Sequence, residues 1–261
     1  MGRETRSKVQ DGVALVTGAG GGIGAAICRK LAARGRRVVA CDIDAAKLDA
    51  LAGELGPAHA TMAFDVSAES QVQQAFDAVE AEYGPIGVMV CAAGLLLFQE
   101  NGERPLIRDT SLEVWQRSFA VNATGVFLCA REYLRRRESR PVTDGRFITF
   151  SSVAAQLGGY RSSASYIAAK AAVLGFTKAL AREAAPLGIT VNSVAPGLID
   201  TEMLRSTVAS SGALQAAHAA IPLGRIGTPD DVAGAVDYLV SPEAGYITGS
   251  VIDVNGGYRM Q

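Results

Sequence analysis

Short, wholly apolar segments alternate with longer helical patterns along this chain, and that alternation restricts its fold more than any other feature. The first apolar segment is Val13–Thr17. A strand that is apolar on both faces belongs in a parallel sheet covered by helices on both sides. We therefore predict an α/β fold with a doubly wound parallel sheet of about seven strands. Later strands are expected at 37–41, 59–64, 88–91, 147–150, 189–194 and 251–254.

The composition suits one globular domain. Of the 261 residues, 49% are hydrophobic and 20% are charged, which is enough apolar material for a large core. No linker or internal repeat divides the chain. We expect a flexible tail over residues 1–10 and a single domain over 11–261, with a lid for a substrate over about 198–224.

Charge and cysteine content exclude several classes of function. The net charge of −1 argues against a nucleic acid or an anionic membrane as the main partner. The four cysteines are far apart and only two histidines are present, so no metal site is expected. Reduced thiols and an N-terminus without an apolar signal segment favour a cytoplasmic location.

A glycine-rich loop, GAGGGIG, joins the first expected strand to a helix. Such a loop lets the backbone approach a pyrophosphate, which the N-terminus of the following helix also attracts. Two registers fit the sequence, Gly20-x-Gly22-x-x-Ala25 and Thr17-Gly18-x-x-x-Gly22-Ile23-Gly24. The loop and the alternating elements together predict a single-domain Rossmann fold that binds a dinucleotide.

Asp42 is expected to select the dinucleotide. It closes the second strand, twenty residues after Gly22, where a carboxylate accepts hydrogen bonds from both ribose hydroxyls. It also repels a 2′-phosphate, and Ile43 follows it in place of a basic residue. This pattern favours NAD over NADP as the cofactor, although Asp42 also suits a helix N-cap. Arg36 and Arg37 would favour NADP, but they precede the strand and are expected to face solvent.

Asp65 ends the third expected strand and is followed by Val66. At that edge of the sheet the pair is suited to contact the adenine. A turn or a helix N-cap is an equally good interpretation of Asp65.

Tyr166 and Lys170 are four residues apart in the helix expected at 163–185, so their side chains share a face. A neighbouring ammonium favours phenolate and lowers the pKa of a phenol. The pair then suits general acid–base catalysis on a secondary alcohol or a ketone. Ordinary helix surface is the alternative interpretation.

Ser152 and Asn122 complete a possible catalytic group. Ser152 follows a strand end, where its hydroxyl can bind a substrate oxygen that gains negative charge, or merely form a turn. Asn122 lies within a helix expected at 112–137, although asparagine prefers caps and turns. Its presence there predicts a local irregularity or a bound water.

Together these motifs resemble the short-chain dehydrogenase/reductase family, in its single-domain branch. The resemblance extends from about Gly12 to the C-terminus and is specific because several motifs occur in a fixed order. The motifs are Thr17–Gly24, Cys91–Gly94, Asn122, Ser152, Tyr166–Lys170 and Ala195–Thr201.

The resemblance implies a role for each of these residues. Tyr166 is the acid/base, Lys170 tunes it and holds the nicotinamide ribose, and Ser152 orients the substrate oxygen. Asn122 keeps a water that links Lys170 to solvent. The cofactor site implied by the family consists of Gly18, Gly22, Ile23, Gly24, Asp42, Ile43, Asp65, Val66, Ala93, Gly94, Tyr166, Lys170, Pro196, Gly197, Ile199 and Thr201.

The chain departs from the family pattern at Cys91, where members commonly have asparagine. We expect this change to cost little chemistry, while a reactive thiol is the alternative. The segment 95–110 is longer than usual and follows a strand end near the expected substrate entrance.

Substrate contacts are predicted for Ser152, Gln156, Tyr160, Tyr166 and Met203. The leading hypothesis is an NAD(H)-dependent oxidoreductase for a secondary alcohol or ketone, of the polyol, sugar-like or cyclic type. A family member that reduces 3-oxoacyl-acyl-carrier-protein with NADPH is the first alternative. Such members tend to carry an arginine where this chain has 186–188, Pro-Leu-Gly.

The remaining expectations concern the functional class, the oligomeric state and a possible acidic partner. A redox-inactive nucleotide-binding regulator is the alternative from another functional class, since a fold alone does not establish function. The family usually forms homotetramers or homodimers through its two long helices, here 112–137 and 163–185. Arg135, Arg136 and Arg137 are interpreted as a solvated helix end, with an acidic partner as the alternative.

Overall fold

Seven parallel strands form the centre of the protein. The computed structural model describes residues 12–98, 104–159, 162–207 and 218–260. Within this part the strand order is β3-β2-β1-β4-β5-β6-β7, and every pairing is parallel. The predicted fold class is therefore confirmed. The strands are β1 (Val13–Thr17), β2 (Val38–Asp42), β3 (Ala60–Ala63), β4 (Ile86–Cys91), β5 (Gly145–Phe150), β6 (Ile189–Pro196) and β7 (Val251–Val254).

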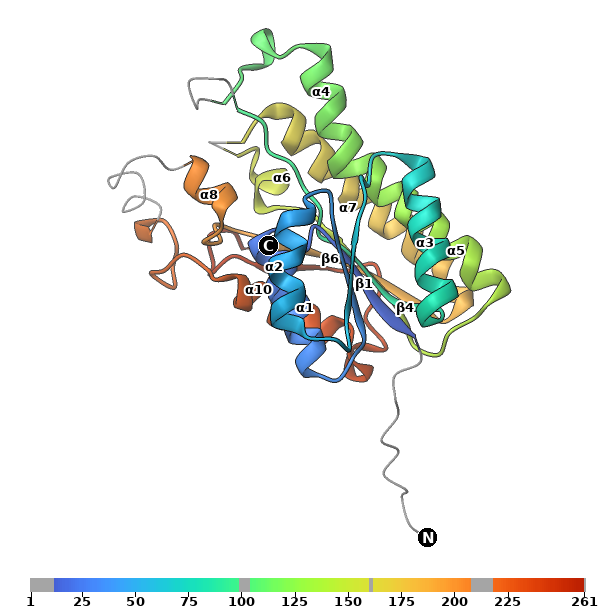
Figure 1. The fold of residues 1–261 in the computed structure, drawn as a ribbon. Helices are drawn as coiled ribbons and strands as arrows, with labels where there is room; N and C mark the ends of the chain where they lie inside the picture. Colours follow the sequence, from blue (N-terminus) through green and yellow to red (C-terminus); the bar gives the residue numbers. More distant parts are fainter. Residues whose placement is uncertain (1–11, 99–103, 160–161, 208–217, 261) are drawn as a thin grey trace.

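Both faces of the sheet are buried under helices (Figure 1). Successive side chains alternate between two hydrophobic clusters, so that Leu15 lies in one and Val16 in the other. This burial explains why the strands are apolar throughout rather than alternating with polar residues. One face is covered by α3 (Glu69–Tyr83), α5 (Gly125–Ser139) and α7 (Ala164–Ala184), and the other by α1 (Gly22–Ala33), α2 (Ala45–Leu55) and α10 (Pro229–Leu239).

The strand order reverses direction at β1, which lies between β2 and β4. Connections leave the two sides of β1 toward opposite faces, so a crevice opens at the carboxyl ends of these strands. Figure 1 shows α4 (Leu112–Phe119), α6 (Val153–Leu157) and α8 (Glu202–Thr207) gathered at this end of the molecule. The fold therefore places a site among the strand ends and these shorter helices.

The helix expected at 112–137 is interrupted. After α4 the chain makes a π-helical turn, η2 (Ala120–Thr124), and then continues as α5. The irregularity expected at Asn122 is thus present. The Asn122 side chain donates to the Ser118 carbonyl one turn back at 2.9 Å and to the Leu95 carbonyl at 2.8 Å. Such side-chain competition for backbone groups accompanies the wider turn.

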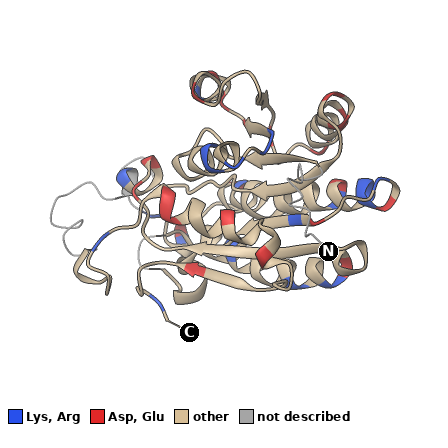
Figure 2. Ribbon diagram, turned by 90° about the horizontal axis from the view of Figure 1, so that it is seen from below, with Lys and Arg blue, Asp and Glu red and all other residues tan. Residues whose placement is uncertain are grey.

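Charged residues of both signs are interspersed over the helices in Figure 2. Two arginines, Arg36 and Arg137, are buried against expectation. Arg36 is 9% exposed and donates to the Val240 carbonyl at 3.0 Å, so the expectation that it faces solvent is wrong. Its cation instead meets the negative end of the α10 dipole. Arg37 is exposed as expected, over the Tyr83 ring.

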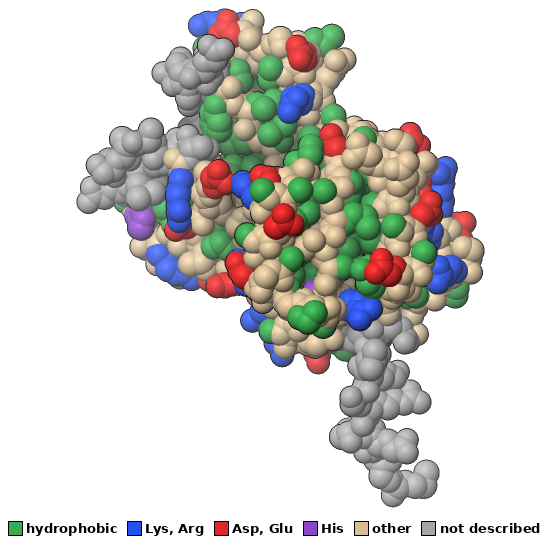
Figure 3. Space-filling view, viewed as in Figure 1, with side chains coloured by type: hydrophobic (Ala, Val, Ile, Leu, Met, Phe, Trp, Pro, Cys, Tyr) green, Lys and Arg blue, Asp and Glu red, His purple; other side chains and the backbone are tan. Residues whose placement is uncertain are grey.

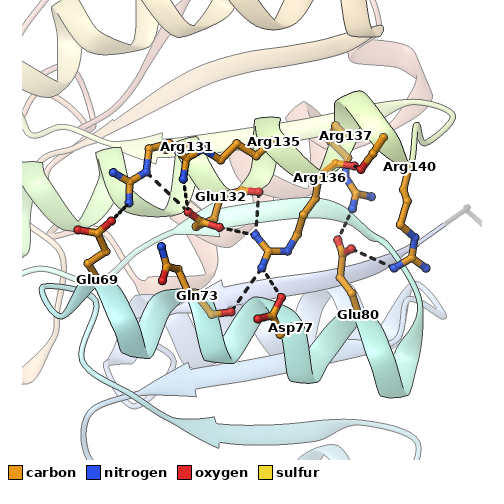
Figure 4. A network of polar contacts seen from close by, with 11 residues as sticks. Glu69, Gln73, Asp77, Glu80, Arg131, Glu132, Arg135, Arg136, Arg137 and Arg140 are labelled. Atoms are coloured by element: carbon orange, nitrogen blue, oxygen red, sulfur yellow. Dashed lines mark hydrogen bonds and ion pairs between the residues drawn. The ribbon is translucent and has the colours of Figure 1, made fainter.

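Arg137 is also buried, although the run of three arginines is predicted to be a solvated helix end. Its side chain is 1% exposed and forms an ion pair with Glu80, whose side chain is 5% exposed. Figure 4 shows this pair within a network between α3 and α5. Glu80 also accepts from the Ile86 backbone N–H at 3.2 Å, and Arg137 donates to the Ile86 carbonyl at 3.2 Å. The pair thus holds both helices to the start of β4.

We expect Glu80→Ala to lower the free energy of unfolding by about 3–5 kcal/mol, because it leaves the buried Arg137 cation without a carboxylate. Arg135→Ala is the matched control. Its side chain is 61% exposed, and loss of its pair with Glu132 should cost about 1 kcal/mol or less. Urea unfolding followed by circular dichroism measures both. Equal losses in the two variants would contradict the structural role of the Glu80–Arg137 pair.

Candidate active site

The glycine loop closes tightly on its neighbours. Gly18 has a φ of +71°, and a Cβ there would lie 2.5 Å from the Ala93 backbone nitrogen. A Cβ on Gly24 would lie 2.1 Å from the Gly18 carbonyl oxygen. Both positions therefore require glycine. Of the two registers, the one that begins at Thr17 contains both of these glycines.

The start of α1 fits a diphosphate group. The helix begins at Gly22, its N-cap residue Gly21 offers no side-chain cap, and its first turn contains no acidic residue. The first N–H groups of a helix need an acceptor, and together with the helix dipole they attract an anion. The chain thus leaves this helix end available to the diphosphate of a dinucleotide.

Asp42 is fixed at the end of β2 by two backbone hydrogen bonds. Its carboxylate accepts from the Gly20 N–H at 2.9 Å and from the Asp44 N–H at 3.0 Å. The N-cap of α2 is Asp44, which accepts from Ala46 and Lys47. Asp42 is therefore no N-cap. It lies beside the glycine loop, where a ribose hydroxyl would need a hydrogen-bond acceptor.

Asp65 and Val66 lie at the neighbouring strand end. Asp65 accepts from the Ser67 N–H at 2.8 Å and from its hydroxyl at 2.7 Å, which is the turn role considered above. Val66 packs under Gly125, where a Cβ would lie 2.9 Å from Val66 Cγ2. Both residues line the same cavity as the glycine loop.

Tyr166, Lys170 and Ser152 meet on the inner wall of this crevice. Tyr166 and Lys170 project from α7, and the Lys170 Nζ lies 5.9 Å from the centre of the Tyr166 ring. Ser152 follows β5 and caps α6, where its hydroxyl accepts from the Ala154 N–H at 3.1 Å. The Lys170 ammonium donates to the Phe150 carbonyl at 3.0 Å.

Burial dominates the ionisation of this group. Burial raises the pKa of Tyr166, and a hydrogen bond with Ser152 partly opposes that rise. The expectation that Lys170 lowers the pKa of the phenol is therefore not met in this structure. Burial lowers the pKa of Lys170 itself to about 8. Desolvation is the largest contribution to both pKa shifts.

Asn122 supports this wall from behind. Its Oδ1 accepts from the Leu95 N–H at 3.1 Å, which joins the π-helical turn to the segment after β4. Gly94 lies between Asn122 and Lys170, since a Cβ on Gly94 would be 3.3 Å from Asn122 Oδ1 and 3.6 Å from Lys170 Nζ. Asn122 is fully buried, and it does not line the cavity.

One cavity of about 1030 Å³ brings the predicted residues together. In Figure 3 hydrophobic side chains gather where the surface is hollowed below the segment that carries α4. The cavity spans both the glycine loop and the Tyr166 wall. All the residues predicted to hold the cofactor line it: Gly18, Gly22, Ile23, Gly24, Asp42, Ile43, Asp65, Val66, Ala93, Gly94, Tyr166, Lys170, Pro196, Gly197, Ile199 and Thr201.

The predicted substrate contacts are only partly brought together. Met203 lines the cavity with Ser152 and Tyr166. Gln156 does not line it, and its Oε1 is buried without a hydrogen-bond partner in the described residues. Tyr160 lies outside the described residues.

The expected lid is described at its two ends, with 208–217 outside the described residues. Its first part contains α8, and Ile221 is buried in its second part.

Sequence reasoning missed several cavity residues on other elements. Arg117 and Val121 line the cavity from α4 and η2, and Tyr258 lines it from the C-terminal segment. Val121 precedes Asn122, so helical spacing alone could have placed it and Arg117 on one face. No local signal marks Tyr258, because only the fold brings it to the cavity.

Two classes of site receive no support from the described residues. Burial raises the pKa of Cys91 well above its ordinary value, so this thiol stays protonated and unreactive. No group of three potential metal ligands occurs in the described part.

Among the helices described there, none has the length and apolar character needed to cross a membrane.

Known proteins share this sequence and this fold. A family model described as enoyl-(acyl carrier protein) reductase matches residues 18–259. The 3-oxoacyl-[acyl-carrier-protein] reductase of Vibrio cholerae is 38% identical over 248 residues, which cover 95% of this chain and 97% of the relative. The short-chain reductase protein NovJ of Streptomyces niveus is 37% identical and covers 95% of this chain and 94% of the relative.

A solved structure extends the similarity to three dimensions. It is a short-chain dehydrogenase/reductase of Brucella melitensis, titled glucose/ribitol dehydrogenase, with 33% identity and a TM-score of 0.87 over 97% of this chain and 98% of that chain. The chain belongs to the short-chain dehydrogenase/reductase family. It is an oxidoreductase of this family, as its motifs predicted.

The buried Lys170 makes stability depend on pH. Its pKa of about 8 lies below its ordinary value of 10.5, so between these values the unfolded chain holds more protons than the folded one. The penalty of burying this lysine is complete below pH 8 and fades as the pH rises to 10.5. We expect Lys170→Met to remove an increment of about 3 kcal/mol in unfolding free energy across that window.

Denaturant unfolding of both proteins at pH 7.5 and pH 10.5 measures this difference. Lys178→Met, an exposed position on the same helix, is the control and should retain the wild-type pH dependence. An unchanged increment in Lys170→Met would mean that Lys170 is not the buried cation described here.

Proposed function

We propose that this protein reduces the ketone of a 3-oxoacyl thioester to a secondary alcohol with a nicotinamide dinucleotide. The observation that carries the proposal is the position of Tyr166, hydrogen-bonded to Ser152 in the cavity that the glycine loop also lines. When bound, the coenzyme supplies a hydride. The residues around the cavity then have to bind the ketone, orient it and deliver a proton.

Tyr166 and Ser152 are suited to the ketone oxygen. Both hydroxyls stabilise the negative charge that develops there during reduction. The raised pKa of Tyr166 keeps its proton in place at neutral pH, which suits donation to an alkoxide. Lys170 holds the Phe150 carbonyl next to Ser152 and stands beside the tyrosine ring. We assign Lys170 the role of orienting this group and its proton supply.

The substrate assignment follows from the relatives and from the lining of the cavity. The Vibrio cholerae and Escherichia coli relatives are 3-oxoacyl-[acyl-carrier-protein] reductases at 38% and 37% identity. Apolar side chains suited to an acyl chain line the cavity near the catalytic group. They are Leu95, Leu96, Leu157, Met203 and Leu204.

For the coenzyme we propose NAD(H). Similarity to acyl-carrier reductases favours NADPH, but Asp42 stands beside the glycine loop, with the exposed Ile43 after it. A carboxylate at this position binds ribose hydroxyls and repels a 2′-phosphate. The glycine loop would hold the diphosphate, Asp65 and Val66 the adenine side, and Pro196 to Thr201 the nicotinamide side.

Oxidation of a polyol or cyclic alcohol with NAD is the second candidate. The Brucella melitensis structure, titled glucose/ribitol dehydrogenase, favours it together with Asp42. This reaction runs in the opposite sense, from an alcohol to a ketone, and needs Tyr166 as the base. A redox-inactive regulator is less well supported, because Ser152, Tyr166 and Lys170 all line the cavity.

A screen of substrates and coenzymes tests this function. We expect a 3-oxoacyl thioester to be reduced faster than polyols are oxidised, with NADH preferred over NADPH, measured by absorbance at the nicotinamide band. Faster polyol oxidation would support the second candidate, and a strong NADPH preference would overturn the role given to Asp42.

The role of Tyr166 yields a sharper prediction. Tyr166→Phe should lower kcat by about a thousandfold, because the proton donor is lost, while NADH affinity stays within about twofold. Tyr246→Phe is the matched control, since that side chain is fully exposed. Steady-state kinetics and coenzyme fluorescence titration provide the two readouts. A Tyr166→Phe variant with normal turnover would exclude this tyrosine as the acid.

A further inference from the structure

A lysine from α2 and a glutamate from α8 form an ion pair at the cavity wall. The Lys47 Nζ lies 2.9 Å from Glu202 Oε2, although the residues are 155 positions apart. Both line the cavity. The side chains are 45% and 84% exposed, so solvent and a bound ligand can both reach them. The inference drawn from this pair rests on the nicotinamide dinucleotide site proposed above.

The Lys47 side chain begins beside the Asp42 carboxylate. A Cβ on Gly20 would lie 3.0 Å from Lys47 Cβ and 3.0 Å from Asp42 Cγ, so both side chains flank one point of the glycine loop. Glu202 raises the pKa of Lys47, and Asp44 and Asp42 add smaller contributions of the same sign. The lysine therefore belongs to the same electrostatic cluster as the carboxylate that faces the ribose.

The other end of the pair lies across the loop. Glu202 follows Thr201, whose Cγ2 would be 3.3 Å from a Cβ on Gly22. The Lys47 side chain thus leads from the Asp42 side of the glycine loop to the Gly22 side. A cation on this path passes the place where the adenosine ribose and the diphosphate of a dinucleotide would lie.

The carboxylates of Asp42 and Glu202, which both lie beside Lys47, decide what this cation can bind. A 2′-phosphate carries about two negative charges and needs a cationic partner, which Asp42 cannot provide. We propose that Lys47 is a coenzyme-specificity residue, which binds the 2′-phosphate of NADP(H) when it is free and which Glu202 occupies to favour NAD(H). Asp42 and Glu202 then act in the same direction, one by repelling the phosphate and the other by engaging its cation.

The energetics allow such a competition. An exposed lysine–glutamate pair is weak and screened by salt. A phosphate dianion forms stronger charge-assisted hydrogen bonds than a single carboxylate. Coenzyme preference in this site is therefore set by the lid as well as by the end of β2, because the lid supplies Glu202.

The test uses the full-length protein and adenosine 2′,5′-bisphosphate, which carries the 2′-phosphate but has no redox chemistry. We expect Glu202→Gln to bind this probe about tenfold more tightly than wild type in isothermal titration calorimetry, because Lys47 is released. Adenosine 5′-monophosphate, which lacks the 2′-phosphate, should bind within about twofold of wild type. The gain should disappear in the double variant Lys47→Met/Glu202→Gln.

Glu54→Gln is the matched control. Glu54 also lies on α2 and pairs with Arg29 at 2.6 Å, with both side chains half exposed, but neither lines the cavity. An unchanged affinity of Glu202→Gln for the bisphosphate would overturn the proposal. A gain that persists without Lys47, or that Glu54→Gln reproduces, would do the same, since it would show a general effect of removed negative charge.

These readouts separate the inference from the proposed function. Binding of the two nucleotides requires no substrate and no turnover, so a wrong substrate assignment leaves the test intact. A protein that binds neither nucleotide would instead refute the dinucleotide site itself.

Discussion

The site depends on the buried ammonium of Lys170. It reaches from α7 to the Phe150 carbonyl at the end of β5, and it stands beside the Gly94 backbone, which Asn122 braces through Leu95. One cation thus ties a helix to a strand end, beside the segment that the π-helical turn supports. Burying it is costly, as its lowered pKa shows. Strongly shifted pKa values of this kind cluster at functional sites, although structural ion pairs also produce them.

The same burial determines the state of Tyr166. A phenol keeps its proton at neutral pH, and burial raises the pKa of Tyr166 further, partly opposed by its hydrogen bond with Ser152. In the absence of bound ligand the wall is therefore a donor rather than a base. A protonated phenol is the form that the reduction proposed above needs, whereas oxidation of an alcohol needs the phenolate. The balance between desolvation and charge, rather than the presence of a nearby lysine alone, therefore sets the pKa of this phenol.

Much of the fold follows from the sequence because burial leaves a pattern in the strands. Strands buried on both faces are wholly apolar, so their order along the chain and the parallel sheet could be predicted. Asn122 likewise indicated the interruption between α4 and α5. Arg36 and Arg137 were predicted to face solvent because the sequence does not show which carbonyl or carboxylate a buried cation will contact. Tyr258 was missed because only tertiary structure brings it to the cavity.

The cofactor side and the substrate side of the cavity share their supports. The segment after β6 is anchored where Ile199 pairs with Gly227, and Thr201 packs against the glycine loop at Gly22. Its far end is held by the C-terminal segment, since the Leu223 N–H donates to the Gly256 carbonyl. This segment therefore contributes Thr201 beside the glycine loop and Met203 to the lining of the same cavity. The glycine loop and the catalytic wall are thus joined structurally, because one segment contributes side chains beside the loop and to the cavity that both line.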